Sequence, residues 1–333
     1  MINIIIALVM FMFLVLVHEF GHFIVAKLSG IQVNEFSIGM GPSVANIKKK
    51  ETLYSIRAIP LGGYVAMEGE DEASEAPNSY TNAKAYQKFL TILAGPLMNL
   101  LTAFLIFLAI STYTGAATRV VDEVLDDSPA MVSGLQVGDE ILSVNQKNSP
   151  SFAYVSQYIN ESQGSPISLE VKRNGEKILI SNIIPEKKDD QYLIGFTVGT
   201  TKKLSSLISE AFYRVIFIIQ LLWLTLKQLF TGVLGLNAVS GPIGVISQVG
   251  QAANLGAIPL LNFLALISVN LAFFNLLPIP ALDGSKLLFI AIEKIIGRKI
   301  NPKFEQTITI VGFILLLGLI FIVSIKDVFS LFK

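Results

Sequence analysis

Long stretches without charge are the feature that most constrains this chain. Asp, Glu, Lys and Arg are absent from 1–18, 89–118, 228–282 and 306–325. Of all residues, 52% are hydrophobic and only 15% are charged, whereas soluble domains carry about 25% charged residues. A helix needs about 20 apolar residues to cross a bilayer. The composition therefore predicts a membrane protein whose solvent is the lipid bilayer, and it excludes disordered and collagen-like chains.

The charge-free stretches predict four membrane-spanning helices. The first, at 2–26, is long enough only if it continues through the polar residues His18, Glu19 and His22. We interpret it as a retained helix rather than a signal peptide, because it has neither a basic start nor a small-residue cleavage site. Glycines interrupt the longest stretch, so only its last part reads as a span. The other three spans are expected at 89–113, 257–277 and 306–326.

The region 119–200 changes character, because charges return and short alternating runs lie between turn signals. Asn174-Gly175 between two such runs predicts a β-hairpin with a tight turn. Earlier, a Pro-started helical turn at Ser128-Pro129 and a Gly138-Asp139 pair before a strand resemble the core of PDZ domains, over roughly 115–200. PDZ domains bind a peptide as an added strand; the alternative is a β-rich spacer that binds nothing.

The fold class expected from these patterns is a polytopic α-helical membrane protein with an inserted β-rich PDZ domain. The chain would comprise about four transmembrane helices and one interfacial or re-entrant helix. The expected domains are a membrane half at 1–113, an extracytoplasmic PDZ domain at 114–200, and a second membrane half at 201–333.

Charge and cysteine content exclude several functions. The chain has 25 basic and 25 acidic residues, so no basic excess points to nucleic acid as a partner. Cysteine is absent, which rules out disulfides, iron–sulfur clusters and thiol catalysis. A metal would have to be held by His, Asp, Glu, backbone or water, and the chain has only two histidines.

Both histidines fall in the sequence His18-Glu19-Phe20-Gly21-His22 of the first span. Residues four apart lie on one face of a helix, so the two imidazoles can share one zinc ion. The glutamate between them can act as the base of a metalloprotease. An ionisable residue inside a membrane helix is costly and indicates function by default. The alternative is a helix end whose polar side chains face lipid headgroups.

A third ligand has to come from elsewhere, and Asp283 is the best candidate. It is the only acid between Glu210 and Glu293, and it directly follows the third span. Pro278 and Pro280 end the helix and stiffen the turn before it. A glycine follows Asp283 and permits a close backbone approach or a positive φ. The alternative is an ordinary aspartate that caps a helix at the membrane boundary.

Taken together, the motifs resemble those of the site-2 protease family of intramembrane zinc metalloproteases, most closely the bacterial RseP/RasP group. The motifs are HEFGH, AGPLMN at 94–99, SGPIG at 240–244 and NLLPIPALDG at 275–284, with a PDZ insertion between the second and third. The similarity covers nearly the whole chain. The chain has room for one PDZ domain, whereas some relatives carry two.

The resemblance implies a set of site residues. His18, His22 and Asp283 would bind Zn²⁺, and Glu19 would be the general acid and base. Asn99 and Asn275 would help to hold the substrate backbone. The implied substrates are single-span membrane proteins such as anti-sigma factors and remnant signal peptides, cut after another protease has removed the outer domain.

The zinc site requires His18, His22 and Asp283 to lie on the same side of the membrane. If the apolar but charge-bearing segment 204–230 also crossed the membrane, Asp283 would emerge on the far side, so we interpret 204–230 as interfacial or re-entrant. The loops 27–88 and 278–305 are rich in Lys and Arg, which indicates that both are cytoplasmic. The protein is then expected in the bacterial inner membrane with its PDZ domain extracytoplasmic.

The segment 51–67 alternates like a β-hairpin, and the resembled family has a hairpin here that dips into the membrane. An edge strand could pair with the substrate and unwind its helix; a cytoplasmic hairpin without substrate contact fits the pattern nearly as well.

The expected function is zinc-dependent cleavage of a transmembrane segment inside the membrane. One alternative is a membrane scaffold whose PDZ domain binds peptides without hydrolysis. A zinc transporter would need more ionisable residues within several spans, and the later spans contain none.

Overall fold

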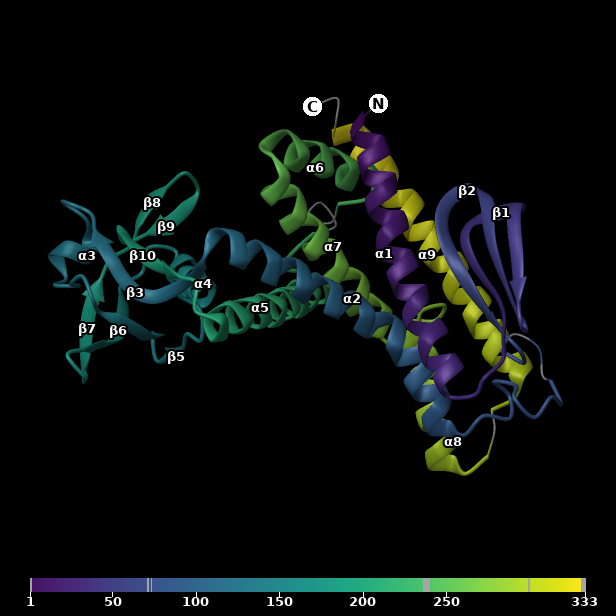
Figure 1. The fold of residues 1–333 in the computed structure, drawn as a ribbon. Coiled ribbons are helices and arrows are strands. Elements are labelled where there is room, and N and C mark those ends of the chain that lie inside the picture. Colours follow the sequence, from purple (N-terminus) through teal and green to yellow (C-terminus); the bar gives the residue numbers. More distant parts are fainter. Residues whose placement is uncertain (1, 71, 73, 236–239, 299, 331–333) are drawn as a thin grey trace. The chain divides into compact units, whose positions relative to one another are not determined.

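The computed structural model describes residues 2–70, 72, 74–235, 240–298 and 300–330. These residues form two compact units (Figure 1). The first unit contains Met1–Ala103 and Ile219–Lys333, and the second contains Phe104–Ile218. Two long helices, α2 (Ala85–Thr114) and α5 (Leu204–Phe230), contribute residues to both units.

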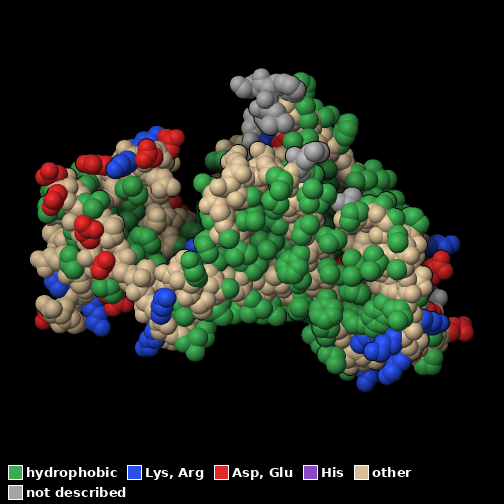
Figure 2. Space-filling model, turned by 45° about the horizontal axis from the view of Figure 1, so that its top comes forward, with side chains coloured by type: hydrophobic (Ala, Val, Ile, Leu, Met, Phe, Trp, Pro, Cys, Tyr) green, Lys and Arg blue, Asp and Glu red, His purple; other side chains and the backbone are tan. Residues whose placement is uncertain are grey.

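The first unit is built mainly from helices. Besides parts of α2 and α5 it contains α1 (Ile2–Leu28), α6 (Pro242–Leu255), α7 (Ala257–Leu276), α8 (Asp283–Ile296) and α9 (Pro302–Ser330). Hydrophobic side chains cover much of the surface of the first unit, and charged side chains gather on the second unit and at one end of the first (Figure 2). Most large apolar residues of α9 between 310 and 322 are about half exposed or more. An apolar surface of this extent fits contact with lipid.

Five described helices are long and apolar enough to cross a membrane: α1, α2, α5, α7 and residues Lys303–Phe329 of α9. The four expected spans are among these helices, and the fifth, α5, is the segment 204–230 that was expected to be interfacial or re-entrant. Within α5, Glu210 pairs with Arg214 one turn later at 3.7 Å, so these two charges partly compensate each other. The segment is one unbroken helix of 27 residues, which favours the interfacial alternative over the re-entrant one.

An apolar cluster holds α1, α6 and α7 together in the first unit. Ala7, Met10 and Leu14 of α1 pack with Val249 of α6 and Ile267 of α7. The three α1 residues repeat at spacings of three and four, which places them on one helix face. Helices α6 and α7 therefore pack against this face, and its last residue, Leu14, lies one turn before His18.

A twisted antiparallel sheet of β1 (Val33–Lys49) and β2 (Thr52–Met67) lies along α1 (Figure 1). Ser37 of β1 faces Ser55 on one side and Tyr64 on the other, so the two halves of β2 flank the first half of β1. The hairpin expected at 51–67 is therefore part of a larger sheet.

The β1–β2 sheet lies beside a long part of α1. At one end Lys27 donates to Glu51 at 2.7 Å, and at the other Gly62 lies against Val15. Twelve residues of helix between these contacts correspond to about 18 Å along the axis. Because α1 is a candidate span, this length places the sheet alongside the part of α1 expected inside the membrane.

A half-buried polar network fixes the shape of this sheet. The carboxylate of Glu35 accepts hydrogen bonds from Ser55, from Arg57 at 2.7 Å and from Tyr64 at 2.6 Å. Burial and the neighbouring Glu35 carboxylate raise the pKa of Tyr64 to about 12. One side chain of β1 thus ties together both halves of β2.

The second unit, called the β-rich unit below, contains a sheet in the order β10-β3-β4-β6-β7, with β5 paired to β4. The sheet surrounds an apolar core together with the short helix α3 and the helix α4. The bounds are β3 Ala116–Val124, α3 Pro129–Val132, β4 Glu140–Val144, β5 Lys147–Asn148, α4 Phe152–Glu161, β6 Ile167–Arg173, β7 Glu176–Ile183, β8 Glu186–Lys188, β9 Gln191–Leu193 and β10 Phe196–Thr201.

The local predictions for this unit are confirmed. Asn174 and Gly175 join β6 to β7 with φ values of 53° and 91°, as a tight hairpin turn requires. The helical turn α3 starts at Pro129, and Gly138-Asp139 precede β4. The Asp139 side chain is fully buried, where Arg173 donates to it at 2.7 Å. A β-rich insertion is therefore confirmed, and its PDZ identity stays a prediction.

Candidate metal centre

Helix α1 presents His18 and His22 one turn apart, and both imidazoles are buried. Glu19 is half-buried and lines the same cavity of about 150 Å³ as the two histidines. The motif therefore forms what its spacing predicts, with two imidazoles on one helix face and a carboxylate beside them.

Asp283 reaches the histidines through the tight connection after α7. Leu277 ends α7 in an extended conformation, Ala281 has a φ of 73°, and α8 begins at Asp283. A Cβ on Gly284 would collide with the carbonyl oxygens of Leu276 and Leu277. The glycine is needed here for close backbone approach, because it lets the first turn of α8 fold back against the end of α7.

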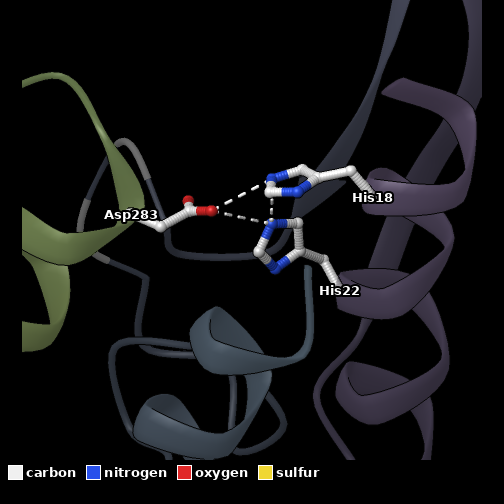
Figure 3. A group of neighbouring side chains, drawn as sticks. All are labelled: His18, His22 and Asp283. Atoms are coloured by element: carbon white, nitrogen blue, oxygen red, sulfur yellow. Dashed lines mark hydrogen bonds and ion pairs between the residues drawn. The ribbon is translucent and has the colours of Figure 1, made fainter. Parts of the chain in front are cut away.

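The three side chains converge on one point (Figure 3). Oδ2 of Asp283 lies 3.0 Å from Nε2 of His18 and 3.5 Å from Nε2 of His22, and the two Nε2 atoms are 3.2 Å apart. Ligands about 2.1 Å from a tetrahedral zinc ion stand about 3.4 Å from one another. The observed triangle therefore has the size of one face of a zinc coordination shell.

The bonding of Asp283 supports the same interpretation. Its Oδ2 atom is buried and, within the described chain, has no partner in hydrogen-bonding geometry. Burial by itself would raise the pKa of Asp283, but the imidazoles of His18 and His22 outweigh it and hold the pKa below its ordinary value. A buried, ionised carboxylate oxygen that lies 3.0 and 3.5 Å from two ring nitrogens fits the ligand set of a cation. The residues present therefore fit zinc.

Helix α2 packs closely behind the two histidines. Nδ1 of His22 donates to the carbonyl oxygen of Thr91 at 2.8 Å. One turn later, Gly95 faces both rings, because a Cβ there would stand 2.5 Å from Cε1 of His22 and 2.9 Å from Cε1 of His18. A Cβ on Gly21 would in turn collide with the carbonyl of Ala94. Glycines on both helices thus bring their backbones together at the site.

The two asparagines of the predicted set are placed differently. Asn99 is fully buried, with Nδ2 3.4 Å from Nδ1 of His18. Asn275 is half-buried in the last turn of α7 and is not among the described residues that line the cavity. The structure therefore brings Asn99 to the histidines and leaves Asn275 outside their immediate contacts.

Sequence reasoning missed an ion pair in this cavity. Lys286 donates to Glu70 at 2.7 Å, and both residues line the cavity with the histidines. Lys286 lies one turn after Asp283 on α8, so helical spacing could have placed it near the site. Glu70 follows β2 in a loop, and no sequence spacing connects it to α8.

Comparison with known proteins identifies the class. The model of peptidase family M50 matches residues 6–319. The chain therefore belongs to this family and is a metalloprotease of the site-2 protease type, which confirms the resemblance seen in its motifs.

Individual relatives are similar to this chain over nearly their full lengths. A protein of Clostridium acetobutylicum, provisionally named zinc metalloprotease, is 39% identical to this chain. The alignment covers 98% of this chain and 97% of the length of that protein. The zinc metalloprotease RasP of Geobacillus kaustophilus is 29% identical over 98% of this chain and 97% of its own. The second alignment extends over 410 residues, so that relative carries insertions that this chain of 333 residues lacks.

Proposed function

We propose that this protein is a zinc-dependent intramembrane endopeptidase that cuts membrane-spanning segments of single-span proteins in the bacterial inner membrane. The observation that carries the proposal is the triangle of His18, His22 and Asp283, with edges of 3.0, 3.2 and 3.5 Å. Both histidines lie on α1, which is long and apolar enough to cross a membrane, and Asp283 follows α7, which is also a candidate span. A non-catalytic scaffold would have no use for this ligand set.

The proposed roles follow from the positions of the side chains. His18, His22 and Asp283 hold zinc, which when bound supplies Lewis-acid polarisation of the scissile carbonyl and of water. Glu19 lines the same cavity without belonging to the ligand triangle. Its carboxylate is placed to take a proton from the attacking water and to return it to the leaving amine.

The proposed substrate enters as an extended strand. In a helix the peptide groups are hydrogen-bonded internally, so cleavage requires local unwinding. Val65 and Met67, at the end of β2, line the cavity that contains His18 and Glu19. This end of β2 forms an edge of the β1–β2 sheet. A substrate strand added to that edge would pass the catalytic side chains.

Helix directions support an interfacial place for α5. Helix α2 is antiparallel to α1, because Thr91 meets His22 whereas the later Asn99 meets His18. Helix α2 therefore ends on the membrane side where α1 begins. Helix α6 packs on the first turns of α1, where Gly250 meets Asn3, and α7 follows it in the direction of α1. The chain thus leaves α2 and enters α7 on the same side.

An even number of crossings is required between α2 and α7. If α5 crossed the membrane, a second crossing would have to follow before Gly256. The described helix there, α6, has 14 residues, which is about 21 Å and too short for a hydrocarbon core of about 30 Å. We therefore place α5 in the interface, with the β-rich unit outside and the basic loops 27–88 and 278–305 inside.

Single cysteines test this topology without interference, because the chain has no native cysteine. Asn148→Cys should react with an impermeant maleimide in intact cells, whereas Glu75→Cys should react only after permeabilisation. Both positions are exposed in the structure. The reverse labelling pattern would refute the proposed orientation.

We further propose that the β-rich unit is a PDZ domain that limits access of substrates with bulky outer domains. Its edge strand β10 lies beside α4, with Phe196 and Phe152 in edge-to-face contact at 6.0 Å. An open strand edge beside a helix is the arrangement by which PDZ domains add a peptide strand.

Metal removal tests the catalytic proposal. Purified protein in lipid vesicles should cleave a single-span substrate whose outer domain has been removed, and the same substrate with a folded outer domain should be cut more slowly. A chelator should abolish cleavage, because it takes away the group that polarises the carbonyl. Stoichiometric zinc should restore it. Cleavage that continues unchanged in metal-free protein would contradict the proposed function.

A further inference from the structure

We propose that Asn99 positions His18 for metal binding, through a hydrogen bond from Nδ1–H of His18 to the Asn99 carboxamide oxygen. This inference rests on the proposed zinc site. It assigns Asn99 a role behind the ligand, in place of the contact with substrate that the family resemblance implies.

The first argument is the tautomer that each histidine needs. An imidazole that binds a metal through Nε2 carries its proton on Nδ1, and that N–H is almost always held by an oxygen acceptor. His22 meets this requirement, because its Nδ1 lies 2.8 Å from the carbonyl oxygen of Thr91. His18 points Nε2 at the same triangle and so needs an equivalent acceptor.

The second argument concerns the carboxamide of Asn99, which lies beside His18. Nδ1 of His18 has the Asn99 carboxamide at 3.4 Å, with Nδ2 as the nearer atom. The carboxamide oxygen of Asn99 is buried and, among the described residues, has no hydrogen-bond partner. A half-turn of the carboxamide exchanges Nδ2 and Oδ1 at nearly the same positions. The oxygen then accepts from Nδ1–H, which leaves Nε2 of His18 free for the metal.

The third argument is burial, which separates this role from substrate binding. Asn99 is 0% exposed and is not among the described residues that line the catalytic cavity. Ser268 of α7 donates to the backbone oxygen of Asn99 at 2.7 Å and so fixes this turn of α2. A peptide backbone would have to displace this packing to reach the carboxamide.

Two substitutions of similar size separate the roles. Asn99→Asp keeps an oxygen acceptor for Nδ1–H but loses the amide donor, whereas Asn99→Leu removes both. If the carboxamide oxygen positions His18, Asn99→Leu should weaken zinc binding by about 10- to 100-fold, as loss of such partners does elsewhere. Asn99→Asp should bind zinc within a few-fold of wild type or more tightly. Competition with a chromogenic chelator on purified full-length protein measures both affinities.

The experiment distinguishes a wrong role for Asn99 from a wrong assignment of the zinc site itself. Asp283→Ala serves as the reference for a lost ligand, and wild type that binds zinc no better than Asp283→Ala would overturn the proposed function. If wild type binds zinc tightly and Asn99→Leu binds it equally tightly, the positioning role is wrong. An unchanged zinc affinity with a raised KM in Asn99→Leu would assign Asn99 to the substrate.

A spectroscopic readout remains informative if Asn99→Leu is less stable. The chain has only two histidines, so labelled imidazoles give two resolvable sets of ¹⁵N–¹H signals in zinc-loaded protein. In Asn99→Leu the Nδ1–H proton of His18 should exchange faster with solvent. The Nδ1–H proton of His22, held by Thr91, should stay protected and reports that the site is folded. Equal protection of both protons in Asn99→Leu would overturn the inference.

Discussion

Glu19→Gln should leave zinc bound and lower the rate of cleavage by roughly 10²- to 10⁴-fold, the usual contribution of a positioned acid–base group. The substitution keeps the size of the side chain and removes its ability to take a proton. Glu19 lines the catalytic cavity but is not part of the ligand triangle. Catalysis and metal binding should therefore separate at this residue.

The matched comparison is His18→Ala, which removes a ligand and should lower both zinc content and activity. Zinc should be measured on the same vesicle preparations in which cleavage of a trimmed substrate is followed. A Glu19→Gln enzyme with full activity would refute the assigned mechanism. Loss of zinc in Glu19→Gln would instead move Glu19 into the ligand set.

The membrane character and the centre of the site were predictable because they depend on local patterns. Charge-free stretches predicted α1, α2, α7 and α9, since a span is a property of composition over about 20 residues. The spacing of His18 and His22 follows from helix geometry. Asp283 could be proposed only because ionisable residues are so rare in this part of the chain.

The residues that surround the two histidines were not predictable, because their positions depend on which helix faces pack together. No pattern in the sequence shows that Thr91, Gly95 and Asn99 face the histidines, although they recur on one face of α2 once that pairing is known. The Glu70–Lys286 ion pair joins a loop to α8 across more than two hundred residues. Composition alone does not separate α5 from the four expected spans, because α5 is also long and apolar; the directions of the neighbouring helices favour an interfacial place for it.

Gly95→Ala should abolish zinc binding, although the same substitution inside a helix ordinarily stabilises a protein. Ala is favoured over Gly in a helix by about 1 kcal/mol. At Gly95, however, the added methyl group would stand 2.5 Å from Cε1 of His22 and 2.9 Å from Cε1 of His18. These separations are well inside van der Waals contact, and the rings can retreat only by leaving the triangle with Asp283.

Gly318→Ala in α9 is the matched control, because a methyl group there meets no described atom within 4 Å. It should keep zinc and raise thermal stability slightly or leave it unchanged. Gly95→Ala should lose the stabilisation that zinc gives to wild type, which is measured as the difference in Tm with and without a chelator. An equal zinc-dependent rise in Tm for Gly95→Ala and wild type would show that α2 does not press against the two imidazoles. The effect is expected to be large because the added methyl group meets both histidine ligands, whereas Asn99 reaches only His18.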